Sequence, residues 1–463
     1  MKLSNLTAIS PVDGRYEKIT IPLRNIFSEY ALLKFRIKIE IHWIKKLSDI
    51  LLIPEIPKFS QKTIIFLDNI VNNFNENDAK YIKLLEKNIN HDVKSIEYFL
   101  KEKFSQILEL KEISQYIHFA CTSEDINNLS YALMLKTARK EIIVPIWNSI
   151  IKNINNMALK YKEIPMLSRT HGQPATPSTV GKEFLNFSYR MQRQLNQFNY
   201  IEILGKFNGA TGNYNAHLAA YPNINWHKIS QEFVLSLDIG WNPYTTQIEP
   251  HDYIAEFFNC MLLFNNILLD FNQDMWGYIS KDYFTQKIIF NEIGSSTMPH
   301  KVNPIYFENS EGNLGLANAL IKHITSKLLI SRWQRDLSDS TVLRNLGIII
   351  SYSIIAYDSV LSGIKRIEVN DKKILYDLNI HWEVLSEAIQ TVMKKYNINN
   401  AYEQLKKFTC GKKINSTNLH VFINNLPIPI QEKKRLIKFT PSNYIGDAVQ
   451  LVISNNKDML NKN

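Results

Sequence analysis

The chain has 463 residues, of which 45% are hydrophobic and 21% charged. These proportions are typical of a soluble globular protein with a large core. The three cysteines are not spaced as metal ligands, and a small, odd number of cysteines does not form a disulfide framework. The formal net charge of +10 suits a polyanionic substrate or a nucleic acid. Because the basic residues are scattered, a solvated basic surface is the favoured interpretation.

Apolar residues recur at three- and four-residue spacing along most of the chain, which predicts helices. The predicted helices cover residues 25–51, 63–110 with a break near 88–92, 129–161, 178–204, 251–291, 314–330 and 346–364. No strand pattern of any length competes, and neither a P-loop nor a Rossmann fingerprint is present. The predicted fold class is therefore all-α.

The stretch 251–291 is the longest of these patterns, with no proline and Gly277 as its only glycine. As one helix it would be about 60 Å long at ~1.5 Å per residue. Its apolar residues occupy much of the circumference, so it needs several neighbouring helices, from this chain or from other subunits. The pattern changes near residue 112 and again over 363–373. These changes predict three domains, at 1–111, 112–364 and 365–463.

The most apolar stretch, 346–364, contains serines, tyrosines and glycines, and it is interpreted as a helix buried in protein rather than in a membrane. The N-terminus has no apolar signal region. With the cysteine usage, this predicts a cytoplasmic protein that does not bind a membrane.

Polar stretches interrupt the helices. They are Pro-Val-Asp-Gly-Arg-Tyr (11–16), Asn-His-Asp (90–92), His-Phe-Ala-Cys-Thr-Ser-Glu-Asp-Ile-Asn-Asn (118–128), Ser-Arg-Thr-His-Gly-Gln-Pro-Ala-Thr-Pro (168–177) and Ser-Arg-Trp-Gln-Arg-Asp-Leu-Ser-Asp-Ser-Thr-Val-Leu-Arg-Asn (331–345). Each could be a turn, a helix cap or a solvated helix edge. Free N–H groups at a helix start also bind anions, and arginine pairs well with carboxylate and phosphate. Residue types alone leave both interpretations open, and 168–177 is predicted to be an irregular loop with His171 at its centre.

The segment 292–313 is predicted to be a loop, because Pro299 and Pro304 each remove a backbone donor. Residues 294–304 read Gly-Ser-Ser-Thr-Met-Pro-His-Lys-Val-Asn-Pro. This string resembles the signature loop of the fumarase/aspartase superfamily, whose members cleave C–N or C–O bonds and release fumarate. Taken together with the polar stretches above and Thr-Gln-Ile-Glu-Pro-His-Asp (246–252), it resembles the adenylosuccinate lyase family in its bacterial form.

The resemblance covers essentially the whole chain and implies a three-domain, fumarase/aspartase-like fold. A long central helical bundle would be shared in a homotetramer, and each active site would take residues from more than one subunit. The implied activity is elimination of fumarate from adenylosuccinate, giving AMP, and from the succinylated aminoimidazole carboxamide ribotide (SAICAR), giving AICAR. No metal or organic cofactor is implied.

This elimination needs a base that removes a proton next to a carboxylate and an acid that protonates the departing nitrogen. His171 suits the acid, since an unperturbed imidazole has a pKa of ~6.5. Residue chemistry would select a second histidine, such as His91, as the base. The resemblance instead implies Ser295 as the base and Glu308 as the carboxylate that orients His171. Lys301 would stabilise the serine alkoxide.

The resemblance also implies a substrate-binding set drawn from the same motifs. Its members are Arg15, Tyr16, Asn90, His91, Asp92, Thr122, Ser123, Gln247, Ser296, Lys301, Val302, Asn303, Asn309, Arg335, Ser340, Thr341, Val342, Leu343 and Arg344. Lys301 and Asn303 would face the succinyl carboxylates. Which arginine binds phosphate and which binds carboxylate stays open.

Three other hypotheses about the function remain open at this point. A related fumarate-releasing lyase, such as an argininosuccinate lyase or a fumarase, shares the signature loop but needs no phosphate site. A helical scaffold without catalysis is a second, although His171, Ser295, Lys301 and Glu308 are all present. A nucleic-acid binder is a third, and the scattered basic residues count against it.

Overall fold

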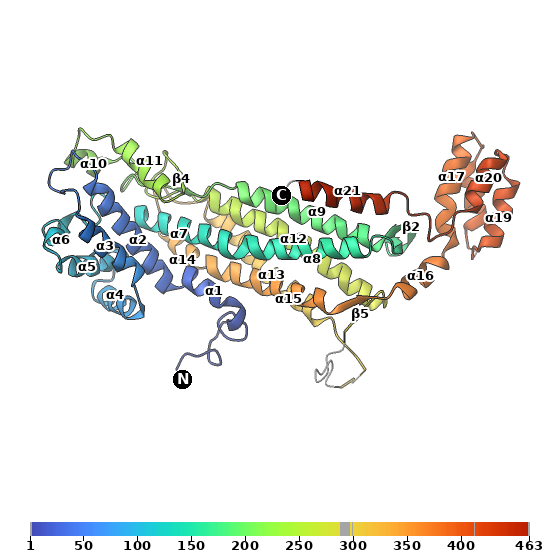
Figure 1. Cartoon of the computed structure of the whole chain (residues 1–463), viewed down its shortest axis with the longest axis horizontal. Helices are drawn as coiled ribbons and strands as arrows, with labels where there is room; N and C mark the ends of the chain where they lie inside the picture. Colours follow the sequence, from blue (N-terminus) through green and yellow to red (C-terminus); the bar gives the residue numbers. More distant parts are fainter. Residues whose placement is uncertain (1, 288–296, 299, 412, 462–463) are drawn as a thin grey trace. The chain divides into compact units, whose positions relative to one another are not determined.

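The computed structural model describes residues 2–287, 297–298, 300–411 and 413–461. As predicted, the regular secondary structure of the described chain is almost all helix, with a few short strands (Figure 1). The α-helices are α1 (Glu17–Phe27), α2 (Glu29–Ser48), α3 (Gln61–Asn72), α4 (Glu76–Ile89), α5 (Asp92–Phe104), α6 (Leu108–Glu112), α7 (Ser123–Ala138), α8 (Val144–Lys160), α9 (Val180–Tyr200), α10 (Asn215–Ala220), α11 (Trp226–Ser236), α12 (Asp252–Ser280), α13 (Ile305–Lys327), α14 (Ser338–Leu343), α15 (Leu346–Lys365), α16 (Asp371–Asn379), α17 (Ser386–Lys395), α18 (Ala401–Thr409), α19 (Ser416–Asn425), α20 (Ile430–Ile437) and α21 (Ala448–Asn461). The other elements are η1 (Ser114–Tyr116), the π-helical η2 (Arg139–Ile143), η3 (Trp382–Leu385), β1 (Pro165–Thr170), β2 (Gln173–Thr179), β3 (Leu204–Gly205), β4 (Gly240–Trp241), β5 (Phe284–Gln286) and β6 (Ile367–Val369).

The chain divides into two compact units, each made of separate segments. Unit 1 comprises Met1–Trp147, Gln194–Asn266 and Gly312–Asp358, and unit 2 comprises Asn148–Arg193, Ile267–Glu311 and Ser359–Asn463. The segments are discontinuous because α8, α9, α12, α13 and α15 each run from one unit into the other. The predicted division into three domains is a different partition and stays a prediction.

Aromatic side chains hold the long helices of unit 1 together around Trp147. Its ring stacks on Phe264 of α12 at 3.9 Å between centroids and lies 4.7 Å from Phe198 of α9. Phe264 in turn meets Tyr357 of α15 edge-on at 5.7 Å. All four side chains are completely buried. Because each such ring removes roughly 150–250 Å² from water, this cluster is a main source of packing energy for the bundle.

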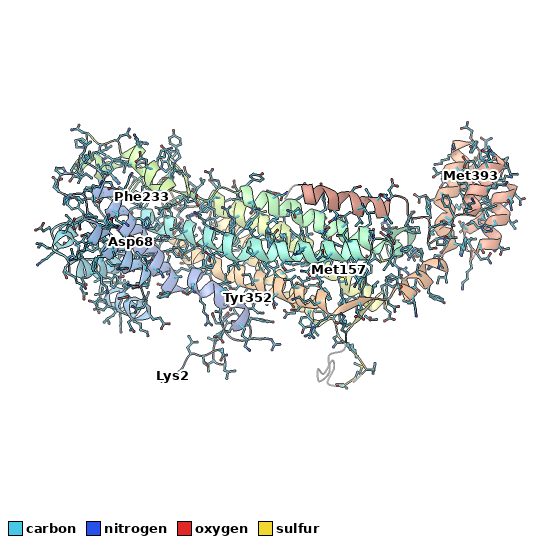
Figure 2. All side chains as sticks on the ribbon, in the orientation of Figure 1. Lys2, Asp68, Met157, Phe233, Tyr352 and Met393 are labelled. Atoms are coloured by element: carbon cyan, nitrogen blue, oxygen red, sulfur yellow. The ribbon has the colours of Figure 1, made fainter. Side chains whose placement is uncertain are left out.

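A second cluster in unit 1 surrounds Trp43 of α2. The rings of Phe207 and Phe233 lie 4.5 and 5.2 Å from it. Phe233, on α11, is labelled in Figure 2. The Trp43 indole N–H also donates to the backbone oxygen of Phe119 at 3.0 Å. This bond fixes the polar stretch before α7 against α2.

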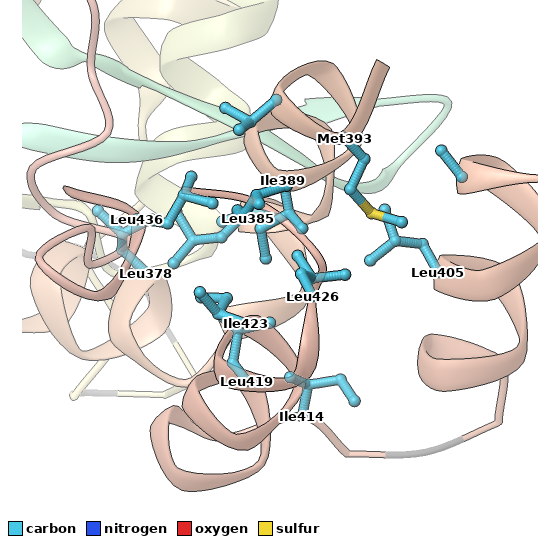
Figure 3. Packing of buried hydrophobic residues seen from close by; sticks show 14 of the residues in the cluster. Leu378, Leu385, Ile389, Met393, Leu405, Ile414, Leu419, Ile423, Leu426 and Leu436 are labelled. Atoms are coloured by element: carbon cyan, nitrogen blue, oxygen red, sulfur yellow. The ribbon is translucent and has the colours of Figure 1, made fainter. Parts of the chain in front are cut away.

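Unit 2 contains its own hydrophobic cluster, formed by the helices near the C-terminus (Figure 3). Its buried members include Leu378, Leu385, Ile389, Met393, Leu405, Leu419, Ile423, Leu426 and Leu436. Each fully buried side chain of this kind stabilises the fold by roughly 1.5–3 kcal/mol relative to exposure. Elsewhere in unit 2, Phe271 of α12 packs against Phe187 of α9 at 5.5 Å.

Several predicted element bounds were wrong. The predicted helix 25–51 is two helices, because Ser28 ends α1 and caps α2, accepting from the Ala31 N–H. α13 begins at Ile305 rather than at residue 314, directly after Pro304, so Glu308 lies on a helix and not in a loop. The predicted irregular loop 168–177 belongs to an antiparallel hairpin of β1 and β2.

The predicted helix 251–291 ends at Ser280, so α12 has 29 residues and a length of about 43 Å. The end is a Schellman arrangement. The Tyr283 N–H donates to the Tyr278 oxygen and the Asp282 N–H to the Ile279 oxygen, both at 3.0 Å. Asp282 takes the left-handed conformation this requires, with φ of 58°. The pattern missed the end because an aspartate holds a position that glycine usually marks.

Two helical stretches are long and apolar enough to span a membrane by length and composition alone, at 252–280 and 338–365. The share of each apolar window that is buried inside the protein is 61%. Such burial fits core helices of the bundle, as predicted for 346–364.

The left-handed residue that ends α12 provides a test of this fold. We expect Asp282→Gly to raise the free energy of unfolding by up to about 1 kcal/mol, because glycine adopts a positive φ without steric cost. Asp282→Val at the same position should lower it by about 1–2 kcal/mol. Urea denaturation of both variants measures this. Equal stability of the two variants would contradict the assigned helix end.

Candidate active site

His171 lies at the tip of the β1–β2 hairpin. The register pairs Thr170 with Gln173 and leaves His171 and Gly172 as a two-residue loop. Both have positive φ, 53° and 75°, which is the signature of a type I′ turn. The Arg169 guanidinium donates to the Gly172 oxygen at 3.3 Å. An exposed imidazole is therefore presented on a short, hydrogen-bonded support.

The signature loop and the start of α13 also belong to unit 2. Ser295 and Ser296, the predicted base and its neighbour, lie outside the described residues. The Lys301 side chain is exposed, and its backbone N–H donates to the backbone oxygen of Met298 at 3.0 Å. The Val302 oxygen accepts from the Gln286 amide at 2.7 Å. Asn303 and Asn309 flank the first turn of α13 and are partly exposed.

Glu308, on that first turn, accepts a hydrogen bond from the Trp276 indole at 3.2 Å. A carboxylate near a helix N-terminus is favoured by the free N–H groups there. Within the part of the single chain that the structure describes, no hydrogen bond joins Glu308 to His171. Their pairing stays a prediction.

The other predicted site residues belong to unit 1, and His91 and Asp92 start α5. Asn90 ends α4 in the left-handed conformation, with φ of 55°. His91 is the N-cap of α5, and its Nδ1 accepts from the Lys94 N–H at 3.2 Å. Because Nδ1 accepts, a neutral ring carries its proton on Nε2. The exposed edge of His91 is therefore a donor.

Asp92 is held between two arginines. Its Oδ2 lies 2.8 Å from Arg36 Nη2 and 3.1 Å from Arg344 Nη2. Burial acts to raise the pKa of Asp92, but both arginines and the Val93 N–H favour the charged form, and the net effect lowers the pKa. Arg344 also contacts Glu29 at 2.8 Å.

Thr122 and Ser123 stand at the start of α7. The Thr122 N–H donates to Asp125 Oδ2 at 2.9 Å, which is half of a capping box. Asp125 also lies 2.9 Å from Lys206 Nζ, and both side chains are completely buried. The helix start is thus fixed to the segment 206–209.

Arg335 is held by three groups. Its Nη2 lies 3.0 Å from Glu124 and 3.5 Å from Asp339, and its Nη1 donates to the Gln247 side chain at 3.4 Å. Beyond it, the predicted residues Ser340, Thr341, Val342 and Leu343 lie on α14, with Arg344 as its C-cap. The Leu343 side chain is buried, so only its backbone is available to a ligand. The Arg15 guanidinium stacks on the ring of Tyr16, the N-cap of α1.

The structure thus connects Asp92, Arg335 and Arg344 in one polar network within unit 1. His171, Lys301, Asn303 and Glu308 all belong to unit 2. Sequence reasoning missed Arg36, Glu124 and Asn127, which connect the unit 1 residues. Glu124 and Asn127 lie inside a motif already singled out. Arg36 sits within an apolar helix pattern, and no feature of the sequence marks it as buried.

His118 and Glu40 form a further charged contact in unit 1. Glu40 is buried and accepts from the His118 backbone N–H at 3.2 Å, with 2.6 Å between its other oxygen and Nδ1. Burial lowers the pKa of His118, but attraction to Glu40 and the hydrogen bond outweigh it, so the pKa is raised.

Comparison with known proteins adds independent information. A family model described as "Lyase" matches residues 14–318, and one described as "Adenylosuccinate lyase C-terminal" matches residues 331–445. An adenylosuccinate lyase of Buchnera aphidicola (subsp. Acyrthosiphon pisum) is 62% identical over 98% of this chain and 99% of the relative. The Escherichia coli (strain K12) adenylosuccinate lyase is 60% identical over the same shares.

Solved structures with low sequence identity share the fold. A 3-carboxy-cis,cis-muconate lactonizing enzyme from Pseudomonas putida superposes with a TM-score of 0.72 at 18% identity, covering 94% of this chain and 96% of the other. A fumarate lyase from Mesorhizobium sp. BNC1 gives 0.73 at 14% identity, covering 93% and 96%. At these identities the likeness concerns the fold alone.

The His118–Glu40 pair predicts a pH-dependent stability. Because the pKa of His118 is raised on folding, the pair contributes its full stabilisation to the folded protein at pH values below the unfolded-state pKa of ~6.5. This contribution is lost as the pH rises through the folded-state pKa of His118. We therefore expect Glu40→Gln to lower the free energy of unfolding more at pH 6 than at pH 9. The difference should be about 1.4 kcal/mol per unit of pKa lost.

Urea unfolding at both pH values, with NMR titration of the imidazoles, measures this. His42 is an internal reference, since burial and the nearby Lys38 and Lys45 lower its pKa to about 4 and keep it neutral at both values. An equal loss of stability at pH 6 and pH 9 would contradict the charged pair.

Proposed function

Because the chain belongs to the adenylosuccinate lyase family, we propose that it eliminates fumarate from adenylosuccinate to leave AMP, and from SAICAR to leave AICAR. The observation that carries this proposal is the 62% identity to a curated adenylosuccinate lyase over nearly the full length of both chains. The separate match of residues 331–445 to the adenylosuccinate lyase C-terminal model favours this substrate over argininosuccinate.

His171 is the proposed general acid. It protonates the nitrogen that leaves as the C–N bond breaks, and an imidazole can hold and give a proton near neutral pH. The type I′ turn supports this role, because the hairpin ladder restricts the backbone on both sides of the ring. Glu308 is the proposed carboxylate that orients His171 in the assembled site.

Ser295 is the proposed base. It removes the proton from the carbon next to the succinyl carboxylate, and the electron pair left behind forms the double bond of fumarate as the C–N bond breaks. A serine needs a strongly stabilised alkoxide for this task, so Lys301 and loop N–H groups are proposed to supply that stabilisation. The same Lys301, with Asn303, is proposed to hold the succinyl carboxylates, while Ser296, Val302 and Asn309 line the pocket.

The unit 1 group is proposed to bind the rest of the substrate. Arg335 and Arg344 are fixed guanidinium groups suited to phosphate or carboxylate. His91 adds a neutral donor, the N–H at Nε2 of its ring. The start of α7 adds further neutral donors at Thr122 and Ser123. Arg15, Tyr16, Asn90, Gln247 and residues 340–343 complete the proposed binding surface.

We place these sites in a cytoplasmic homotetramer, with each site built from more than one subunit. Exposed apolar side chains on the long helices are available for packing in such an assembly. They include Leu263 on α12 and Leu316 on α13, which are 48% and 52% exposed in the single chain. The absence of a His171–Glu308 bond among the described residues of one chain fits a pair formed between subunits.

The activity is tested by fumarate release from adenylosuccinate, followed by absorbance. We expect wild type to be active, and His171→Ala and Ser295→Ala each to lose about 10²–10⁴-fold in kcat, the usual contribution of a general acid or base. His323→Ala, an exposed histidine on α13, is the matched control and should keep its rate.

No fumarate release by a folded wild-type protein would overturn the proposed reaction. Near-normal turnover by one of the two variants would remove only that residue from its role. If Ser295→Ala is active, His91 is the next residue to test as the base.

The hairpin turn gives a second prediction for the same assay. Gly172 has a φ of 75°, so Gly172→Val should strain the turn by about 1–2 kcal/mol and displace His171. We expect a loss of about tenfold in kcat for this variant. Gly172→Asn, which tolerates a positive φ, should keep most of the activity. Equal rates for the two variants would mean that the turn does not position the acid.

A further inference from the structure

We infer that three buried residues, Arg36, Asn127 and Glu124, are positioning residues that hold the anion-binding arginines Arg335 and Arg344 in place. The inference rests on the proposed function, because that proposal places Arg335 and Arg344 in the substrate site. It adds a buried connection that runs beneath the binding surface of unit 1.

The first half of the connection starts at Arg36 on α2, which is 1% exposed. Its Nη2 donates to Asp92 Oδ2 at 2.8 Å, and the same oxygen accepts from Arg344 Nη2 at 3.1 Å. Asp92 therefore joins a completely buried arginine to a partly exposed one. Because Arg36 cannot leave the core, Asp92 is a fixed anchor for Arg344.

The second half runs from Arg36 to Arg335 through α7. Arg36 Nε donates to Asn127 Oδ1 at 2.8 Å, and Asn127 Nδ2 donates to Glu124 Oε1 at 2.8 Å. Glu124 Oε1 in turn lies 3.0 Å from Arg335 Nη2. The two bonds of Asn127 agree on the orientation of its amide, since one requires its oxygen and the other its nitrogen.

The segment from Arg335 to Arg344 is thus held at both ends by one continuous series of polar contacts. Glu124 and Asn127 are 2% and 7% exposed, so water does not compete for these bonds. The planar, forked guanidinium group of Arg36 is essential to this series of contacts, because two of its nitrogens donate to two different partners, Asn127 and Asp92. A lysine at the same position has a single nitrogen and lacks this fork.

Stability alone is a poor explanation for this arrangement. Burying ionised groups costs solvation energy, and such networks are often no more stable than apolar packing. In the part of the chain that the structure describes, Arg36 Nη1, Glu124 Oε2 and Arg335 Nε are buried without a hydrogen-bond partner. Fixing the direction of two guanidinium groups accounts for the arrangement.

The test uses Arg36→Lys and Asn127→Leu in the full-length protein. Arg139→Lys is the matched control, because Arg139 is an arginine of the same unit that donates to backbone oxygens of Phe198 and Ile201. We expect both network variants to raise KM for adenylosuccinate at least tenfold with kcat within threefold of wild type. This split indicates lost binding rather than lost chemistry. The control should keep its KM within twofold.

A second readout does not depend on the reaction. Inorganic phosphate, as a probe anion, should raise the Tm of wild type and of the control, and should raise the Tm of the network variants by less than half as much. Loss of Tm with unchanged KM and an unchanged phosphate effect would overturn the inference and leave the network as a structural element. If wild type released no fumarate, the proposed function would fail, and the phosphate readout would still decide the role of the network.

Discussion

The carboxylate of Asp125 is the contact on which the proposed binding surface of unit 1 depends. It lies 2.9 Å from Lys206 Nζ, and neither side chain is exposed. It also accepts from the backbone N–H groups of Thr122, Asn208 and Gly209. Breaking a buried pair by removing one partner typically costs about 3–5 kcal/mol. The start of α7 is therefore fixed, and with it the positions of Glu124 and Asn127.

The two units differ in how their charged and titratable side chains are buried. In unit 1, charged groups are gathered, buried and paired, as around Asp92, so that guanidinium groups keep their direction without substrate. In unit 2, His171 and Lys301 are exposed on a turn and a loop, so the proposed general acid and the proposed carboxylate-binding cation are accessible to a ligand. Preorganised charge and accessible proton donors suit an elimination that develops negative charge on a carboxylate.

The sequence predicted the helical class and the family because both depend on local information. Spacing of apolar residues identifies a helix, and the 294–304 string is too specific to arise in an ordinary loop. The β1–β2 hairpin escaped prediction because Pro174 and Pro177 suppress a strand pattern, and pairing with residues 165–170 supplies the missing order.

The end of α12 depends on Asp282 adopting the left-handed conformation, which cannot be predicted from an aspartate at this position. The role of Arg36 depends on what α5 and α7 place around it, so no pattern within α2 could identify it. Burial and long-range pairing therefore account for most of what the sequence left out. The roles proposed for Ser295 and Ser296, which lie outside the described residues, rest on the motif alone.

The division into interleaved units has a consequence for how the chain is made. The unit 2 segment Asn148–Arg193 is synthesised well before Ser359–Asn463, and its Leu167, on β1, packs in the hydrophobic cluster of the later segment. At about 5–20 residues per second, the ribosome needs on the order of ten seconds to reach the last segment. During that interval Leu167 of β1 lacks the cluster of later helices against which it packs. Nascent chains of this protein should therefore expose this apolar side chain until translation is nearly complete.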